Sequence, residues 1–336
     1  MKKPLFATYL VLLFTGFGAT PPSVPVSAET PLVTSQVSPT SPNASTPLQP
    51  QVELLNPGNE PRQILRFKPA ANAKQTTIMT MSMNMSGTVE SESIPTMAIP
   101  TMDFPTITMT LEAATKPLNN GDIQIDFAYS NVDVGSDTTA PPDVLEMMRS
   151  QLQILTAVKM SYVIDNQGNT KNVNIILPDK LDPNLKQFVD QLLNSLEQFA
   201  ISPFPNEAVG VGAKWQIVSS LPLMGLPANQ MKMIYEVGNI QDDQVTLNVT
   251  MEMQGGSLTS TEMPFPGLPP GLDLTIKSMA IQSTGTLILE LDQIMPISGR
   301  TSTVSNMEMS INNPNTNKPM NMKMNSTIDM TIESPF

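Results

Sequence analysis

Alternating methionines in residues 76–86, TTIMTMSMNMS, have the side chains best suited to unusual chemistry in this chain. Met79, Met81, Met83 and Met85 are separated by single polar residues. In a β-strand their thioethers would lie on one face, with Cα atoms about 6.6 Å apart. Thioethers favour Cu(I), so these four residues form one candidate metal site. The alternative is an apolar face of a strand that packs into a core.

The core-face interpretation agrees better with the rest of the sequence. The same-face positions of 245–253 and 320–332 hold Val, Leu, Ile or Met, and the chain contains no histidine or cysteine to add a stronger ligand. Methionine is unbranched and polarisable, so a lining rich in it suits a cavity for a hydrophobic ligand. A core that is simply rich in methionine would explain the same residues. The candidate apolar lining comprises Met79, Met81, Met83, Met109, Met148, Phe188, Leu192, Met251, Met322 and Met324.

The missing histidine and cysteine also limit catalysis. Without them a Ser-His-Asp triad, a Cys-His dyad and every histidine-containing zinc or copper site are excluded. The remaining acid–base groups are scattered carboxylates, which we interpret as solvated surface charges: Asp126, Asp133, Asp137, Asp242 and Asp243. No nucleotide-binding glycine motif is present. We therefore expect a non-catalytic protein without a cofactor.

The N-terminus has the features of a secretory signal peptide. Lys2 and Lys3 precede a short apolar run, and Val26-Ser27-Ala28 supplies small residues for cleavage. We expect residues 1–28 to be a bacterial signal peptide and residues 29–60, rich in Pro, Ser and Thr, to be a disordered tether. A single β-rich domain is expected over residues 61–336. The protein should thus be exported to the periplasm or the cell exterior.

The charge balance excludes two classes of partner. The chain has 18 basic and 30 acidic residues, a net charge of −12, without basic clusters. Such a chain has no electrostatic attraction for nucleic acid or for an anionic membrane surface. No second run of about 18 apolar residues follows the first, so no span of a membrane is expected. The remaining partners are a hydrophobic small molecule or lipid, or a lipidated protein; the oligomeric state stays open.

Hydrophobic periodicity predicts the fold class. Apolar residues alternate with polar ones in most segments after residue 61, as expected for an antiparallel sheet with one wet face. The last such segment would extend roughly 45 Å, so we expect strong twist and a half-barrel-like sheet. Spacings of three and four predict two amphipathic helices, 141–157 and 182–199, on the apolar face. The fold class is therefore α+β.

Three further segments have distinct patterns. Residues 158–177 predict a hairpin that turns at Asp165–Asn169. Two proline-rich inserts, 93–106 and 262–274, are expected to be loops because proline cannot donate to a strand ladder. Trp215 should anchor one end of the core after a turn made by Gly210 and Gly212.

These segments also carry a family resemblance. Phe204-Pro205, Val209, Gly212 and Trp215 resemble the FP…V.VG..W signature of a family of exported bacterial β-rich domains of unassigned function. In that family the signature follows a YxxD..G hairpin, similar to Tyr162, Asp165 and Gly168. The resemblance covers most of the chain after residue 61; it implies export and a β-rich fold and transfers no catalytic residue. In shape, long strands with two covering helices are similar to periplasmic lipoprotein carriers (LolA-like half-barrels).

Overall fold

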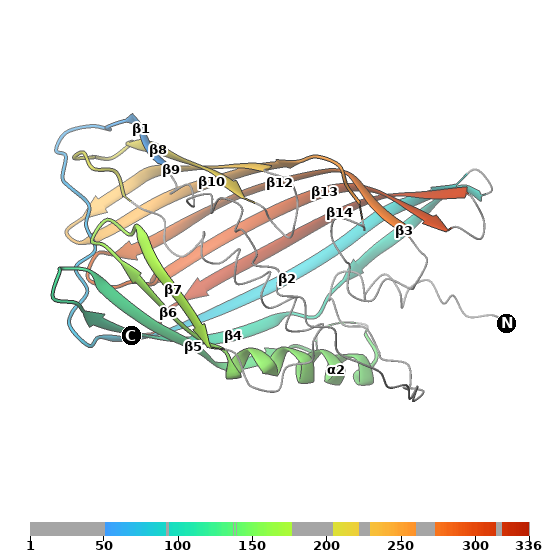
Figure 1. The fold of residues 1–336 in the computed structure, drawn as a ribbon, viewed down its shortest axis with the longest axis horizontal. Coiled ribbons are helices and arrows are strands. Elements are labelled where there is room, and N and C mark those ends of the chain that lie inside the picture. Colours follow the sequence, from blue (N-terminus) through green and yellow to red (C-terminus); the bar gives the residue numbers. More distant parts are fainter. Residues whose placement is uncertain are drawn as a thin grey trace, which may run out of the picture.

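The structure, a computed structural model, describes residues 51–91, 94–136, 138, 140–176, 204–221, 229–259, 273–313 and 318–335. These residues form one large sheet with a helix beside it (Figure 1). The strands are β1 (Gln51–Asn56), β2 (Lys74–Ser91), β3 (Ile94–Asp103), β4 (Ile107–Pro117), β5 (Ile123–Val134), β6 (Lys159–Ile164), β7 (Thr170–Ile176), β8 (Lys214–Leu221), β9 (Asn229–Gln241), β10 (Gln244–Gly255), β11 (Leu258–Thr259), β12 (Asp273–Glu290), β13 (Ser298–Asn313) and β14 (Lys318–Glu333).

All strand pairs of this sheet are antiparallel, which confirms the main expectation for the fold. The strand order is β1-β8-β9-β10-β12-β13-β14-β2-β4-β5-β6-β7, with β11 beside β12 and β3 beside β2. The sheet consists of two antiparallel meanders that meet where β14 pairs with β2. It is open, and the short strands β1 and β7 form its two edges. The half-barrel-like coiling that we expected is therefore not confirmed.

The alternating residues explain why the strands bury one face. In β14, Met322 and Met324 are buried, whereas Lys323 and Asn325 between them are exposed. Residues directly opposite each other in paired strands point to the same side of a sheet. The registers therefore join the apolar positions of neighbouring strands into one surface, which we call the core face. Across β13, β14 and β2, for example, Met309 lies opposite Met322, which lies opposite Val89.

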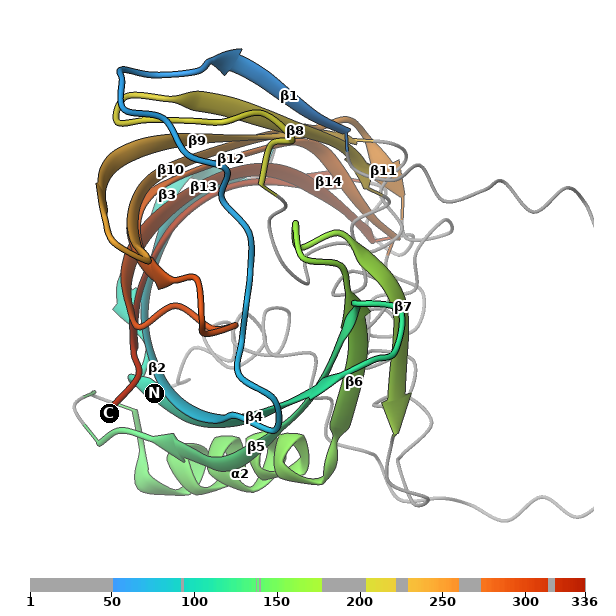
Figure 2. The same cartoon turned by 90° about the vertical axis from the view of Figure 1, so that its left-hand side faces the viewer.

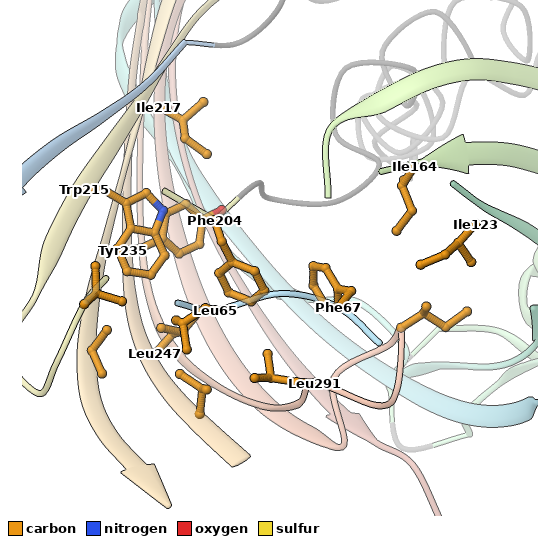
Figure 3. Packing of buried hydrophobic residues seen from close by; sticks show 14 of the residues in the cluster. Leu65, Phe67, Ile123, Ile164, Phe204, Trp215, Ile217, Tyr235, Leu247 and Leu291 are labelled. Carbon is orange, nitrogen blue, oxygen red and sulfur yellow. The ribbon is translucent and has the colours of Figure 1, made fainter. Parts of the chain in front are cut away.

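One end of the core face is packed with aromatic and aliphatic side chains (Figure 3). Trp215 is 1% exposed, its ring stacks on Tyr235 at 5.5 Å, and its edge meets Phe204 at 6.4 Å. The same cluster includes Ile125 of β5 and Ile164 of β6, so it joins strands from both ends of the sheet order.

The chain between β1 and β2 ties this end together. It runs from β1 across to β2, as the blue segment in Figure 2 shows. Gln63 forms a β-bridge with Val209, and the amide of Phe67 donates to the carbonyl of Asn166. The amide of Lys68 donates to the carbonyl of Leu291. Residues 51–60, expected to belong to a disordered tether, instead form β1 and the start of this connection.

One α-helix, α2 (Pro142–Leu152), is present in the described residues, continued by a 3₁₀ turn, η1 (Gln153–Ala157). It confirms the first expected helix. Leu145 and Met148 pack on Val134 at the end of β5, in a cluster separate from those of the central strands. Arg149 holds the helix to β5 through an ion pair with Asp133 at 3.1 Å. Hydrogen bonding from Arg149 lowers the pKa of Asp133 and raises that of the guanidinium.

The expectation that two helices cover the apolar face is not borne out. α2 packs on the end of β5, and Figure 1 shows the helix running along that strand. The second expected helix, 182–199, lies outside the described residues.

Two other local predictions have clear outcomes. The hairpin at Asp165–Asn169 is confirmed: β6 and β7 pair around it, and Gly168 has a φ of 96° that suits glycine. The prediction that 93–106 is a loop is wrong, because Ile94–Asp103 forms β3 and pairs with β2. Proline is tolerated there because β3 pairs only with β2 and is an edge strand. Residues 262–272 of the second insert lie outside the described residues, and its last two residues begin β12.

Candidate functional site

The predicted methionine lining falls on strands in the middle of the sheet. Met79, Met81 and Met83 lie on the core face of β2, and each is half-buried. Met109 of β4 lies directly opposite Met79, and it too is half-buried. Met251 of β10 is half-buried on the same face, four strands away from β2. These predicted residues therefore share one surface, although they do not converge on a single point.

Met85, which we grouped with Met79, Met81 and Met83 as a metal alternative, has a different environment. It is 0% exposed and packs with Leu274, Met309, Met322 and Met324 in a cluster drawn from β2, β12, β13 and β14. Met79, Met81 and Met83 are not part of this cluster. The structure thus divides the four alternating sulfurs into one buried residue and three that are half-buried.

The other predicted lining residues lie elsewhere. Met322 and Met324 are buried in the cluster of Met85, so they contribute packing rather than free surface. Met148 lies on α2 in the separate cluster at the end of β5. Phe188 and Leu192 lie outside the described residues.

The two ends of the core face are buried, whereas its middle is half-buried. At the aromatic end, Trp215, Tyr235 and Leu247 are at most 2% exposed. At the opposite end, the cluster of Met85 is also buried. Between these two ends, large side chains on β2 and its neighbours remain half-buried, among them Met81 and the opposing Met330. We call this zone the central zone of the core face.

The core face of β13 holds a set of hydroxyl side chains that the sequence analysis missed. Thr303 donates to Ser283 of β12 across the strand pair, with an O···O distance of 2.9 Å. Thr301 and Ser305 flank Thr303 on the same face, and Ser326 of β14 lies opposite Ser305. From the sequence, only Ser326 of β14 stands out as a break in an apolar face. Residues 300–306, RTSTVSN, are polar at even and odd positions alike except for Val304, so alternation does not show which face of β13 points to the core.

A cavity of about 600 Å³ lies beside the start of β2, outside the central zone. Its lining includes Gln75 and Ser334, whose side chains are 3.1 Å apart and hydrogen-bonded. Gln75 also accepts from the amide of Met295, and the buried hydroxyl of Thr77 bonds Ser334 at 2.8 Å. These polar groups are satisfied within the protein, so the arrangement is best explained as a tie between the C-terminal residues and β2.

Carboxylates with a shifted pKa lie away from the central zone of the core face. Asp122, whose side chain is 8% exposed, accepts from Lys171 at 2.6 Å, and this bond is the main cause that lowers the pKa of the carboxyl. Burial raises the pKa values of Tyr162 and Tyr129, because the phenolate would lose its hydration.

The carboxylates that we had considered as acid–base candidates do not gather. Asp126 is exposed on β5, Asp133 pairs with Arg149, and Asp242 and Asp243 are exposed in the turn between β9 and β10. Asp137 lies outside the described residues. Throughout the described ranges, no group of three or more Asp or Glu side chains could hold a metal ion.

Comparisons with known proteins do not assign the chain to a family. No protein-family model matches it, and a search of curated proteins gives no significant match. The resemblance to the FP…V.VG..W domains therefore remains a prediction. Within the part of the chain that the structure describes, no helix is long and apolar enough to cross a bilayer.

Proposed function

We propose that this chain is an exported, non-catalytic protein that binds a hydrophobic molecule, or the lipid part of a lipidated partner, in the bacterial cell envelope. The observation that supports it is the central zone, where Met81 and Met330 stay half-buried while both ends of the same face are closed. Monomeric proteins usually leave few contiguous apolar patches without a use. The proposed ligand lies along this zone of the open sheet.

Methionine gives this zone suitable chemistry for such a ligand. Its unbranched side chain changes rotamer easily, so Met79, Met81 and Met83 can adapt to ligands of different shape. Removal of apolar surface from water contributes about 25 cal/mol per Å², which is the driving force for binding. The closed aromatic end around Trp215 supplies the rigid scaffold that such an adaptable surface needs.

Export is part of the proposal, supported by the signal-peptide features of residues 1–28. An envelope location would also supply the ligand, because lipids and lipidated proteins are abundant there.

The test uses Nile red, an uncharged dye whose fluorescence rises on apolar surfaces. The full chain should bind it saturably, and Met81→Gln should weaken binding several-fold because it places an amide in the central zone. Thr80→Gln is the matched control, since Thr80 is the neighbouring residue on the opposite face of β2. Native mass spectrometry of protein isolated from the periplasm should show an added mass.

Two outcomes would reject the binding proposal. A bare polypeptide mass together with no saturable Nile red signal would support the alternative, a structural or protein-interaction domain with a methionine-rich core. Equal losses in Met81→Gln and Thr80→Gln would show that the dye does not report on the core face.

Cu(I) binding is a second candidate, favoured by the packing of Met85, Met309, Met322 and Met324 in one cluster. Thioethers from three strands could supply several soft ligands there. Titration against the chelator bicinchoninate decides the matter: a copper site should withdraw Cu(I) from the chelator and lose this ability in Met85→Leu. If the chelator keeps all of the metal, this candidate is rejected.

A further inference from the structure

The hydroxyl side chains in the middle of the core face form a continuous band across three strands. Ser283 lies opposite Thr303, and Ser305 lies opposite Ser326. Thr301 is the next core-face residue of β13 before Thr303. Directly opposite Cβ atoms in such pairs are about 4.5–5.5 Å apart, so these hydroxyls are neighbours. We call these five residues the hydroxyl band.

The hydroxyl band borders the half-buried methionines. Thr303 lies opposite Ile328 of β14, which lies opposite Met83 of β2. Thr301 similarly lies in line with Met330 and Met81. A molecule that covers the central zone therefore meets apolar side chains on β2 and hydroxyls on β13.

Several hydroxyls of the band have hydrogen-bonding capacity to spare. Among the described residues, the Thr303–Ser283 bond is the one side-chain hydrogen bond made within the band. Thr301, Thr303 and Ser305 are half-buried, so a bound molecule could reach them. A hydroxyl that is covered and left without a hydrogen-bond partner destabilises the complex, so an occupant that covered the band would have to supply acceptors or donors.

The central part of the core face carries no charge. In β10, β12, β13, β14, β2 and β4, the described side chains at core-face positions are apolar, hydroxyl or amide groups, or the residue is glycine. A carboxylate or phosphate placed there would have no cationic partner, and an unpaired charge in an apolar environment is strongly disfavoured. A neutral polar group would instead be matched by the hydroxyl band.

We infer that the ligand of the proposed site is an uncharged amphiphile whose ester linkage lies on the hydroxyl band while its acyl chain covers the methionines of β2. This inference rests on the proposed function and narrows it to neutral acyl esters. Ser283, which accepts from Thr303 and keeps its own hydrogen, and Ser305 donate to the ester oxygens, and Met81 and Met83 contact the chain. A free fatty acid can place its tail in the zone, but its carboxylate has to stay in solvent.

Competition against Nile red tests this with three probes of equal chain length: methyl oleate, oleate at pH 8, and 1-octadecene. We expect methyl oleate to displace the dye at the lowest concentration. The Ser283→Ala and Ser305→Ala variants, each removing one hydroxyl with little change of shape, should weaken the binding of methyl oleate about two- to tenfold and leave the binding of 1-octadecene unchanged. Thr284→Val is the matched control, because Thr284 is exposed on the opposite face of β12.

The outcomes separate the two levels of the proposal. Saturable Nile red binding with no preference for the ester, or equal losses of affinity for ester and alkene in the Ser305→Ala variant, would overturn the inference and leave the binding function standing. Oleate binding as tightly as methyl oleate would also overturn it, because a carboxylate would then be accepted. No Nile red binding at all would reject the proposed function itself. Unfolding midpoints of each variant establish that it is folded.

Discussion

Truncation of two methionines on one strand tests the burial gradient of the core face. Met85 is 0% exposed and surrounded by other buried side chains, whereas Met81 is half-buried on the same face of β2. In Met85→Ala the lost side chain leaves a cavity that its neighbours fill only in part. In Met81→Ala the vacated space opens to solvent, so less apolar contact is lost and no closed cavity forms.

The magnitudes follow from these environments. Truncation of a buried methionine costs about 2–5 kcal/mol, and we expect about 3 kcal/mol for Met85→Ala. For Met81→Ala we expect about 1 kcal/mol, typical of a side chain that is already partly hydrated. For a domain of this size, 1 kcal/mol corresponds to about 2–4 °C in Tm, so the expected losses are about 6–12 °C and about 2–4 °C.

Thermal unfolding followed by circular dichroism measures the two Tm values, and urea titration checks them. The slope of the unfolding free energy with urea should stay constant while the midpoint falls. Equal losses in the two variants would refute the reasoning, because Met81 would then be as closely packed as Met85 and the central zone would not be available to a ligand.

Two further changes test the packing at the edges of the core and one ion pair. A Cβ at Gly210 would lie 1.8 Å from the carbonyl oxygen of Asn59, so Gly210→Ala should lower the free energy of unfolding by about 1–3 kcal/mol. Gly256 has open space around its Cβ, so Gly256→Ala should lower it much less in the same urea titration. Hydrogen bonding from Lys171 lowers the pKa of Asp122. The pair therefore stabilises the fold fully at pH values above the ordinary carboxyl pKa near 3.9, and this contribution disappears as the pH falls through the lowered pKa. Asp122→Asn should therefore lower Tm more at pH 7 than at pH 2, and an equal loss at both would contradict this; the exposed Asp126→Asn serves as the control.

The division of the core face into closed and half-open parts has a simple origin in composition. Aromatic residues make up 5% of the chain, and several of them, such as Phe67, Phe204, Trp215 and Tyr235, gather at one end. Large flat rings fill space efficiently and fix one arrangement. Towards β2 the face depends on methionine, which packs less specifically and tolerates a change of neighbours. A rigid end and an adaptable middle on one sheet are the properties that the proposed binding role requires.

Alternation of residue types predicted the strands and the inward face wherever polar and apolar residues strictly alternate. In β14 this was sufficient to assign Met322 and Met324 to the core and Lys323 to solvent. Alternation failed for β3, because local rules treat Pro95 and Pro100 as strand breakers and cannot know that this segment has one neighbour only. Alternation also gave no prediction of the inward face of β13. There Val304 is 43% exposed, and the hydroxyls of Thr303 and Ser305 face the core.

The sequence by itself determined that this is a β-rich protein whose methionines line strands, and it ruled out histidine- and cysteine-based chemistry. These properties depend on residue identity and on the period of two along a strand, which are local. The pairing of β14 with β2, the burial of Met85 beside Met322 and Met324, and the hydroxyl band across β12, β13 and β14 were decided by the tertiary structure alone. They depend on strand order and register between segments far apart in the sequence, such as Met81 and Met330, which are separated by 249 positions. No local pattern encodes which distant strand becomes a neighbour.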